Sequence, residues 1–469
     1  MAVKQTKIVA TISDLNCDVE LIETLYKEGM NVVRLNTAHQ SHADTLKVIN
    51  NVRAVSEKIP VLVDTKGPEV RTQGIEEGIE VKEGEKIVIS NSLAEGEKGF
   101  SVNYDDFTND IPVGSTVLID DGETGMTVVA KEGAKLICEI GNDGVIKNRK
   151  SVNVPDVHID LPSLTQKDRD YIDFCIENNV DFIAHSFVRN KKDVLDIQEI
   201  LDAAGSDIKI ISKIENRSGV DNIEEIIDVS YGIMVARGDL GIEIPEEEVP
   251  VMQKKIIEAC VRKSTPVITA TQMLHTMIKN PRPTRAEVSD VANAIYDGTD
   301  AVMLSGETAY GNYPIEAVQT MTKIAKMIES TKPAREHLEP ATLNDQVHSF
   351  MAEASVVACE ELPVKAMIIN TGAGKSARLA SSYRGFTPIY AMSEDKRVIR
   401  ELALSYGVYA NYLEKADNTD KMVIEDLTKL AEKGAVSSED LVAIVGKTPR
   451  ATGGAANFFE VTTVGQCTK

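Results

Sequence analysis

Apolar residues in the first two thirds of the chain fall into short β-branched runs, each followed by a stretch with helical spacing. Residues 19–29 and 248–264, for example, carry the apolar stripe of an amphipathic helix. The runs are nearly continuous in apolar residues, which is typical of buried parallel strands. They are 6–13, 31–36, 61–65, 181–187, 208–215, 232–239, 266–271 and 300–307.

These eight strand–helix units predict a (β/α)8 TIM barrel, and their regular count favours it over the alternative, a doubly wound open sheet. Between the third and fourth runs the pattern changes to short alternating strands punctuated by glycine. We interpret residues 69–158 as a small β-barrel lid domain inserted at the top of the barrel. The TIM barrel itself is then built from residues 1–68 and 159–335.

The last third of the chain predicts a separate unit. Residues 331–345 contain proline and are weakly patterned, as a linker would be. From 346 to 469 strands and helices alternate again, which predicts a C-terminal α/β domain. Its predicted strands are 365–371, 388–393, 408–413, 440–446 and 456–464.

Composition narrows the class of protein. With 51 basic and 73 acidic residues the net charge is −22, which disfavours nucleic acid as a partner. The six cysteines have no paired spacing, which argues against a zinc site or a disulfide framework and indicates a reducing compartment. No run approaches the ~20 apolar residues of a membrane helix. We therefore expect a cytoplasmic protein with no membrane partner.

The ends of the predicted strands carry the candidate chemistry, because the carboxyl ends of barrel strands converge on one pocket. Glu215 and Asp239 end neighbouring runs, and two carboxylates without His or Cys suit Mg²⁺ or Mn²⁺. The cations near these ends indicate a polyanionic substrate, most simply a phosphate. Those cations are Arg34, Lys66, Arg71 and Lys213.

Several of these stretches resemble the pyruvate kinases, in order and over nearly the whole chain. They include VRLNTAH (33–39), DTKGPEVRT (64–72), ISKIEN (211–216), IMVARGDLGIEIP (233–245) and TATQML (269–274). The resemblance implies Mg²⁺-dependent phosphoryl transfer from phosphoenolpyruvate to ADP, giving pyruvate and ATP, the last step of glycolysis. It also implies a homotetramer and regulation by a sugar phosphate.

The resemblance also implies roles for individual residues. Glu215 and Asp239 match the ligands of the divalent ion, and Lys213 matches the lysine that neutralises the phosphoryl group in transfer. The substrate contacts of the family match Arg34, the backbone N–H of Gly238, Asp239 and Thr271. The resemblance places Thr271 beside the methylene carbon that is protonated. Nucleotide contacts match Asn36, Arg71 and Lys150.

The potassium site of the family is only partly matched. Asn36, Asp64 and Thr65 correspond to three of its oxygen ligands, but Ala38 stands where most relatives have serine. Glu69 is the residue that accompanies potassium use in the family, and an uncompensated charge there would favour a nearby monovalent cation. We therefore expect potassium to bind, with weakened affinity.

The glycine turn INTGAGKSARLA (369–380) in the C-terminal domain is the candidate effector site. A Walker A motif would need glycine where Ile369 stands, so that interpretation fails. Free N–H groups at a helix start can still hold a phosphate. The residues that the resemblance implies for a sugar phosphate are Thr371, Lys375, Ser376 and Arg450.

Two other functions remain alternatives on these residues. A metal-dependent aldolase or lyase would use the same pair of carboxylates, although it would need neither a lid nor a second phosphate pocket. A catalytically silent sugar-phosphate sensor would keep the fold, but loss of Arg34, Lys213 or Thr271 would then be expected.

Overall fold

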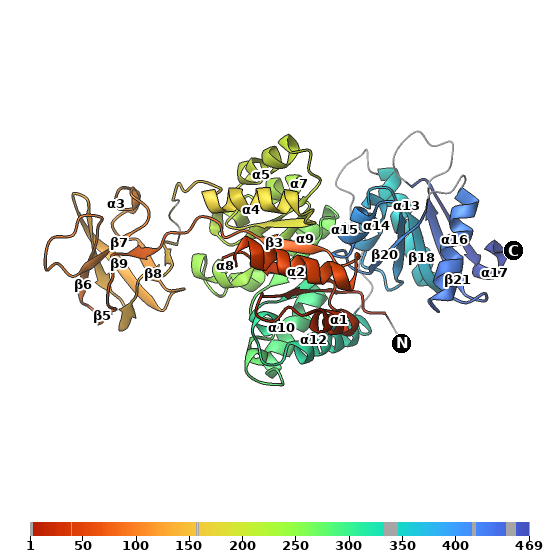
Figure 1. Ribbon diagram of the computed structural model, residues 1–469, viewed down its shortest axis with the longest axis horizontal. Helices are drawn as coiled ribbons and strands as arrows, with labels where there is room; N and C mark the ends of the chain where they lie inside the picture. The colour runs from red at the N-terminus through yellow and green to blue at the C-terminus, as the bar shows by residue number, and fades with distance from the viewer. Residues whose placement is uncertain are drawn as a thin grey trace.

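The protein is described by a computed structural model over residues 3–38, 40–155, 157, 159–332, 346–414, 419–446 and 456–468. Three parts lie in a row, with a barrel between an inserted β unit and the C-terminal α/β unit (Figure 1). Within those ranges no helix combines the length and apolar character needed to cross a bilayer.

The central part confirms the predicted TIM barrel. Eight parallel strands close in the order β1-β17-β16-β15-β14-β13-β3-β2. They are β1 (Lys7–Thr11), β2 (Val32–Asn36), β3 (Val61–Asp64), β13 (Phe182–His185), β14 (Lys209–Ile214), β15 (Gly232–Ala236), β16 (Val267–Ala270) and β17 (Ala301–Leu304). Side chains alternate between the barrel interior, as Val9 does, and the layer under the helices, as Ile8 and Ala10 do.

Every barrel strand is shorter than its predicted run, and β15 and β17 lose the most at their carboxyl ends. β15 ends at Ala236, so residues 237–239 begin a helix, and Asp239 lies in a helical first turn instead of on a strand. β17 likewise ends at Leu304, and α11 begins at Gly306. The apolar pattern could not mark these ends because helices begin at or just after them.

Several helices around the barrel begin at polar caps, among them α1, α2, α4, α5 and α10. Asp18 accepts a hydrogen bond from the N–H of Leu21 and starts α1, which ends at Gly29 with φ 123°. The barrel helices are α1 (Val19–Glu28), α2 (His42–Val55), α4 (Gln166–Glu177), α5 (Lys191–Ala203), α6 (Arg217–Asp221), α7 (Ile223–Val229), α8 (Arg237–Glu243), α9 (Val249–Arg262), η1 (His275–Ile278), α10 (Arg285–Asp297), α11 (Gly306–Ala309) and α12 (Pro314–Glu329).

The insertion is a seven-stranded sheet in the order β12-β8-β9-β10-β6-β7-β4, with a two-stranded sheet β11-β5 beside it. Its edge strands meet where Arg71 pairs with Ser151 and where the N–H of Val152 donates to the carbonyl of Val70 (2.9 Å), so the sheet curls into a small barrel. The elements are β4 (Thr72–Gln73), β5 (Ile79–Val81), β6 (Lys86–Ile89), β7 (Gly99–Val102), α3 (Phe107–Asp110), β8 (Thr116–Ile119), β9 (Thr124–Glu132), β10 (Lys135–Ile140), β11 (Gly144–Ile146) and β12 (Val152–Asn153).

The C-terminal part is a five-stranded sheet in the order β20-β19-β18-β21-β22, in which only β22 is antiparallel to its neighbour. This confirms the predicted α/β unit. Its elements are α13 (Gln346–Glu361), β18 (Val364–Asn370), α14 (Lys375–Ser382), β19 (Ile389–Ser393), α15 (Lys396–Leu402), β20 (Val408–Tyr412), α16 (Thr419–Glu432), β21 (Leu441–Gly446), β22 (Phe458–Thr463) and α17 (Val464–Cys467).

This C-terminal unit closes the amino-terminal end of the barrel. Leu404 packs into the apolar barrel interior with residues such as Val9 and Leu62. Beside it, Arg384 and Asp300 form a buried ion pair of 2.7 Å. Because side chains of one unit complete the core of the other, the two units form a continuous structure.

Candidate active site

Lys213 lies at the centre of the candidate active site, near the carboxyl end of β14. Alternation along the strand places it on the same face as Ile211, which fills the barrel interior. Its Nζ is 2.8 Å from Glu215 Oε1 and 3.2 Å from Asp64 Oδ1, and it donates a 2.8 Å hydrogen bond to the Ser186 hydroxyl. The carboxyl ends of three strands, β3, β13 and β14, therefore meet at one ammonium group.

Electrostatics keep this ammonium charged. Burial alone would lower the pKa of Lys213, but the carboxylates of Asp64 and Glu215 outweigh it and raise that pKa above its ordinary value. Burial would likewise raise the pKa of Asp64, but Lys213 and Arg34 hold it below its usual range. The site therefore holds a fixed positive charge in a water-poor pocket.

Arg34 is the second buried cation. It follows the inward-facing Val32 on β2, and its Nε and Nη2 donate to Asp64 Oδ2 at 2.8 and 2.5 Å. Its Nη1 donates to the Thr11 hydroxyl at 3.1 Å. One carboxylate thus orients both cations toward the mouth of the barrel.

Glu215 and Asp239 form a close carboxylate pair beside Lys213. The Phe187 N–H donates to Glu215 Oε2 at 2.6 Å, which fixes one oxygen. Burial raises the pKa of both carboxyl groups, and Lys213 offsets this only in part. Two buried carboxylates that retain protons readily are a favourable place for a cation, so these residues fit a divalent ion.

The rest of such an ion's coordination shell would come from elsewhere. Within the described ranges no three His, Cys, Asp or Glu side chains gather as a metal site. Two protein carboxylates leave the other positions to oxygen atoms of substrate and water, as is common for Mg²⁺.

Thr271 lies in a strained turn opposite Gly238. Its φ of 67° and that of Gln272, 56°, are in the left-handed region, which a β-branched residue rarely adopts. The Gly238 N–H donates to the Thr271 hydroxyl at 2.8 Å. Arg237 supports the turn by donating to the Thr271 carbonyl at 2.7 Å while it pairs with Asp290.

The predicted nucleotide residues Arg71 and Lys150 lie in the insertion and away from this cluster. Arg71 pairs with Glu69 (2.6 Å), and Lys150 pairs with Asp120 (2.7 Å). Both cations are therefore held by carboxylates of the insertion itself.

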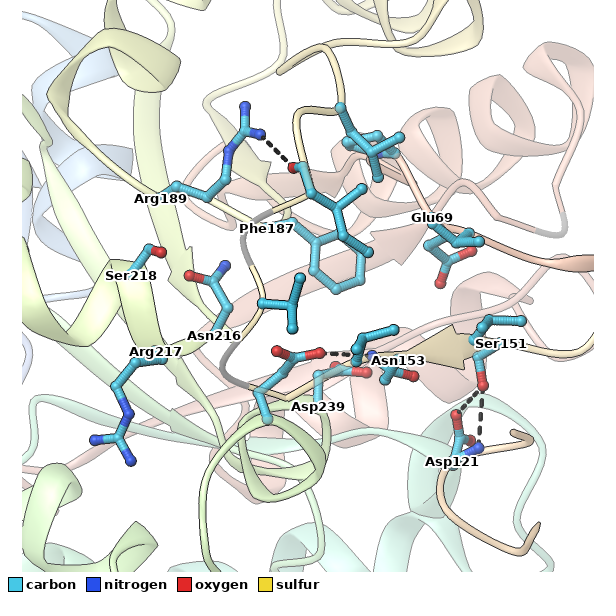
Figure 2. Close-up of a pocket in the computed structure, with 18 residues that line it drawn as sticks. Glu69, Asp121, Ser151, Asn153, Phe187, Arg189, Asn216, Arg217, Ser218 and Asp239 are labelled. Carbon is cyan, nitrogen blue, oxygen red and sulfur yellow. Dashed lines mark hydrogen bonds between the residues drawn. The ribbon is translucent and has the colours of Figure 1, made fainter. Parts of the chain in front are cut away.

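A cavity of about 280 Å³ separates the insertion from the barrel mouth. Figure 2 shows Asp121, Ser151 and Asn153 of the insertion on one side and Asp239 and Asn216 of the barrel on the other. A direct hydrogen bond, from Asn153 Nδ2 to Glu243 Oε1 (2.9 Å), crosses to α8 in this region.

The residues predicted for potassium are adjacent but already bonded. Asn36 Oδ1 accepts from the Ala38 N–H at 3.0 Å, and the Thr65 carbonyl accepts from the Ser186 hydroxyl at 2.7 Å. Glu69 is compensated by Arg71, with Lys66 at 3.8 Å. The condition under which Glu69 would favour a monovalent cation, an uncompensated charge, is therefore not met in this structure, because Lys66 and Arg71 lie against its carboxylate.

The predicted effector loop begins α14. The Thr371 hydroxyl accepts from the Gly374 N–H at 2.9 Å, and Gly374 has the left-handed φ of 75° that precedes Lys375. Thr371 and Ser376 line a cavity of about 470 Å³. Arg450 lies outside the described residues.

Sequence reasoning missed Ser186 and Phe187, which follow the fourth strand. Ser186 contacts Lys213, and the Phe187 N–H contacts Glu215. Because strand ends converge on one pocket, the position of Ser186 after the fourth strand could have indicated it, although a single serine is a weak signal. The contact of Phe187 is made by its backbone N–H, which leaves no signal in the sequence.

The fold and this site define a class: a TIM-barrel enzyme with a carboxylate pair and two buried cations at the carboxyl end of its strands, suited to an anionic substrate. Sequence profiles described as "Pyruvate kinase, barrel domain" and "Pyruvate kinase, alpha/beta domain" match residues 3–318 and 349–462.

Individual relatives agree with these profiles. A pyruvate kinase of Borreliella burgdorferi is 53% identical over 468 residues, covering 99% of this chain and 98% of the relative. A pyruvate kinase of Staphylococcus epidermidis is 44% identical, and the match covers 98% of this chain and 81% of the relative. One of Geobacillus stearothermophilus is 45% identical, and the match covers 98% of this chain and 80% of the relative. The chain belongs to the pyruvate kinase family and is a phosphotransferase of glycolysis.

Proposed function

We propose that the cluster around Lys213 is where the phosphoryl group passes from phosphoenolpyruvate to ADP. The observation that carries this is the position of the Lys213 ammonium, held between Asp64 and Glu215. Phosphoryl transfer needs positive charge placed in advance, because charge spreads over the phosphoryl oxygens as the bond to the enolate breaks. Arg34, anchored on Asp64, supplies the second charge to the substrate phosphate.

We assign the divalent ion, Mg²⁺ or Mn²⁺, to Glu215 and Asp239. When bound, the ion neutralises negative charge on the enolate and the phosphoryl group. The chain's own part is to present two carboxylates at a fixed distance from Lys213, with one oxygen of Glu215 oriented by the Phe187 N–H. The raised pKa values of both carboxyl groups support this assignment.

We assign the substrate carboxylate to the Gly238 N–H at the start of α8, where helix N–H groups favour an anion. In that state the N–H would leave the Thr271 hydroxyl, which lies 2.8 Å away. The freed hydroxyl is placed to pass a proton, through a water, to the methylene carbon of the enolate. The strained backbone at Thr271 supports a functional role for this turn.

The insertion acts as the lid, and its closure brings Arg71 and Lys150 to the nucleotide phosphates, with Asn36 on the barrel side. Exclusion of water favours transfer to ADP over hydrolysis. Potassium binds at Asn36, Asp64 and Thr65, with a water in place of the missing side chain at Ala38. Its affinity is low because these oxygens already accept hydrogen bonds.

Regulation and assembly complete the proposal. A sugar phosphate binds at the start of α14 through Thr371, Lys375 and Ser376, with Arg450 as a further contact. The enzyme is a cytoplasmic homotetramer, as its family resemblance implies. Sigmoidal phosphoenolpyruvate saturation that becomes hyperbolic with fructose 1,6-bisphosphate or a hexose monophosphate would support the effector site, and unchanged curves with both would remove it.

The decisive experiment measures pyruvate and ATP formed from phosphoenolpyruvate and ADP, with Mg²⁺ present and with chelator. Metal-dependent formation of both products in equal amounts is expected. Absence of both products would overturn the proposal: carbon–carbon bond cleavage of a pyruvate-yielding substrate would then indicate an aldolase or lyase, and retained sugar-phosphate binding without any turnover would indicate a sensor.

A further inference from the structure

Asp168, in the first turn of α4, makes more bonds than a helix cap requires. Thr165 and Asp168 form a capping box, in which Asp168 Oδ2 accepts from the Thr165 N–H (2.9 Å) and hydroxyl (2.6 Å). The second oxygen, Oδ1, accepts from the N–H groups of Lys66 (3.0 Å) and Gly67 (3.2 Å). The Asp168 residue is only 1% exposed.

Lys66 and Gly67 are the residues by which the chain leaves the barrel for the insertion. Two residues further on the backbone already belongs to the insertion, because the Glu69 carbonyl accepts from Asn103 (3.0 Å) and the Val70 carbonyl accepts from Val152 (2.9 Å). Asp168 holds one side of this junction and the insertion holds the other. Pro68 therefore lies between the segment held by the barrel and the segment held by the insertion, and we call it the pivot.

The anchored backbone also lies against the candidate active site. A Cβ on Gly67 would be 2.8 Å from Ser186 Cβ and from Phe187 Cδ2, so only glycine fits there, and its φ is +71°. Ser186 and Phe187 are the residues that contact Lys213 and Glu215. The position of Gly67 and the position of the proposed catalytic groups are thus set by the same contacts.

The same turn of α4 holds a second loop. Lys167 Nζ donates to the carbonyls of Thr37 (2.8 Å) and Ala38 (3.3 Å), which follow β2. The first turn of α4 therefore contacts both the loop after β2 and the junction after β3.

We propose that Asp168 is a positioning residue that fixes the pivot of the lid against the barrel, so that each closure brings Arg71 to the same place above Lys213. This inference rests on the proposed function in one respect, that the insertion closes over the phosphoryl group. Without the anchor, the junction at 66–68 would move, closure would be imprecise, and water would compete with ADP. Water would then take the phosphoryl group as the bond between phosphorus and the enolate oxygen breaks, giving inorganic phosphate and pyruvate.

The first test measures backbone amide exchange in the full chain without substrate. In Asp168→Ala, peptides covering 62–72 should exchange about tenfold faster, while peptides from β6 and β10 in the insertion stay unchanged. Asp168→Asn keeps an oxygen that accepts from both N–H groups, so it should stay closer to the wild type. Thr165→Ala loses the helix cap but keeps Asp168 Oδ1, so it should loosen the first turn of α4 and leave 66–67 protected.

The second test measures the ratio of inorganic phosphate to ATP formed from phosphoenolpyruvate and ADP. Asp168→Ala should raise this ratio about tenfold and lower kcat more than it raises KM for phosphoenolpyruvate. Thr165→Ala should keep the wild-type ratio. If a folded Asp168→Ala variant keeps wild-type exchange at 66–67, the anchor does not exist; if exchange rises and the ratio does not, the anchor does not govern closure. Amide exchange needs no turnover, so failure of the proposed function and failure of this inference are distinguishable.

Discussion

Lys213 Nζ lies 2.8 Å from Glu215 Oε1, so the cation proposed to meet the phosphoryl group is also in direct contact with a proposed metal ligand. Each group lowers the cost of burying the other. Removing either one alone leaves an uncompensated charge in the pocket.

Substitution of Lys213→Met keeps the length of the side chain and removes its charge. We expect kcat to fall by about 10²–10³-fold, the usual cost of losing one preorganised charge-stabilising group. Lys209→Met is the matched control, because Lys209 starts the same strand at the opposite end of the barrel, 3.8 Å from Glu401. Steady-state kinetics of both variants check this, and an equal loss in both would argue against a role for Lys213 in transfer.

Substitution of Glu215→Gln removes one charge from the carboxylate pair without changing its shape. Loss of an outer-shell partner of a metal ligand typically costs ~10–100-fold in metal affinity. Because Glu215 is proposed as a direct ligand, the Mg²⁺ concentration for half-maximal activity should rise by at least that factor. Glu247→Gln, an exposed acid on the barrel, controls for net charge. Titration of Mn²⁺ binding gives the affinity directly, and unchanged affinity in Glu215→Gln would place the ion elsewhere.

Substitution of Ala38→Ser returns a side-chain oxygen to the proposed potassium site. Because Asn36 Oδ1 already accepts from the Ala38 N–H, the loop has a fixed geometry onto which the hydroxyl is added. The K⁺ concentration for half-maximal activity should fall several-fold, roughly the effect of one added ligand oxygen. Rates are compared in K⁺ and in tetramethylammonium, and a wild type equally active in both would exclude a potassium site.

Asp426, on α16 of the C-terminal unit, should make the stability of the folded protein depend on pH. Burial raises the pKa of its carboxyl group from 3.8 to about 7, with the Asn370 side chain opposing in part. Between these values the folded state holds a proton that the unfolded state has lost, so stability falls as pH rises from 4 to 7 and is constant above. At 1.36 kcal/mol per pKa unit, the rise from 3.8 to about 7 makes the loss about 4 kcal/mol.

Asp426→Asn should therefore remove this slope and raise the melting temperature of the C-terminal unit at pH 8. The contrasting variant is Asp440→Asn, because hydrogen bonds from Ser437 hold the pKa of Asp440 below its usual range and its loss should destabilise at neutral pH. Thermal unfolding followed from pH 4 to 8 distinguishes the two. A wild-type slope in Asp426→Asn would show that another group is responsible.

The strand count and the charged strand ends were predictable because each depends on local pattern. Alternation along β14 places Ile211 inside the barrel and so places Lys213 there as well. The helical position of Asp239 was not predictable, because α8 begins at Arg237 directly after β15 ends at Ala236, with no connecting loop between them. Its proximity to Glu215 nevertheless follows from the barrel, since neighbouring strands are adjacent at their ends.

Other features depend on contacts between segments far apart in the chain, and such contacts cannot be predicted from the pattern of a single sequence. The capping box at Thr165 and Asp168 is readable from sequence, but the bonds from Asp168 to Lys66 and Gly67 join residues about a hundred positions apart. Likewise, Leu404 reads as an ordinary helix-end leucine and instead completes the barrel interior.

Strand β1 connects the C-terminal unit to the candidate active site. At its start Lys7 donates to the Val408 carbonyl of β20 (2.5 Å), and at its end the Thr11 hydroxyl accepts from Arg34 (3.1 Å). The five residues of β1 are separated by four intervals of ~3.3 Å, so the strand spans about 13 Å between the C-terminal unit and Arg34, the arginine proposed to bind the substrate phosphate. Because neither hydrogen bond involves residues 333–345, cleavage of the peptide chain there would leave the connection between Val408 and Arg34 through β1 in place.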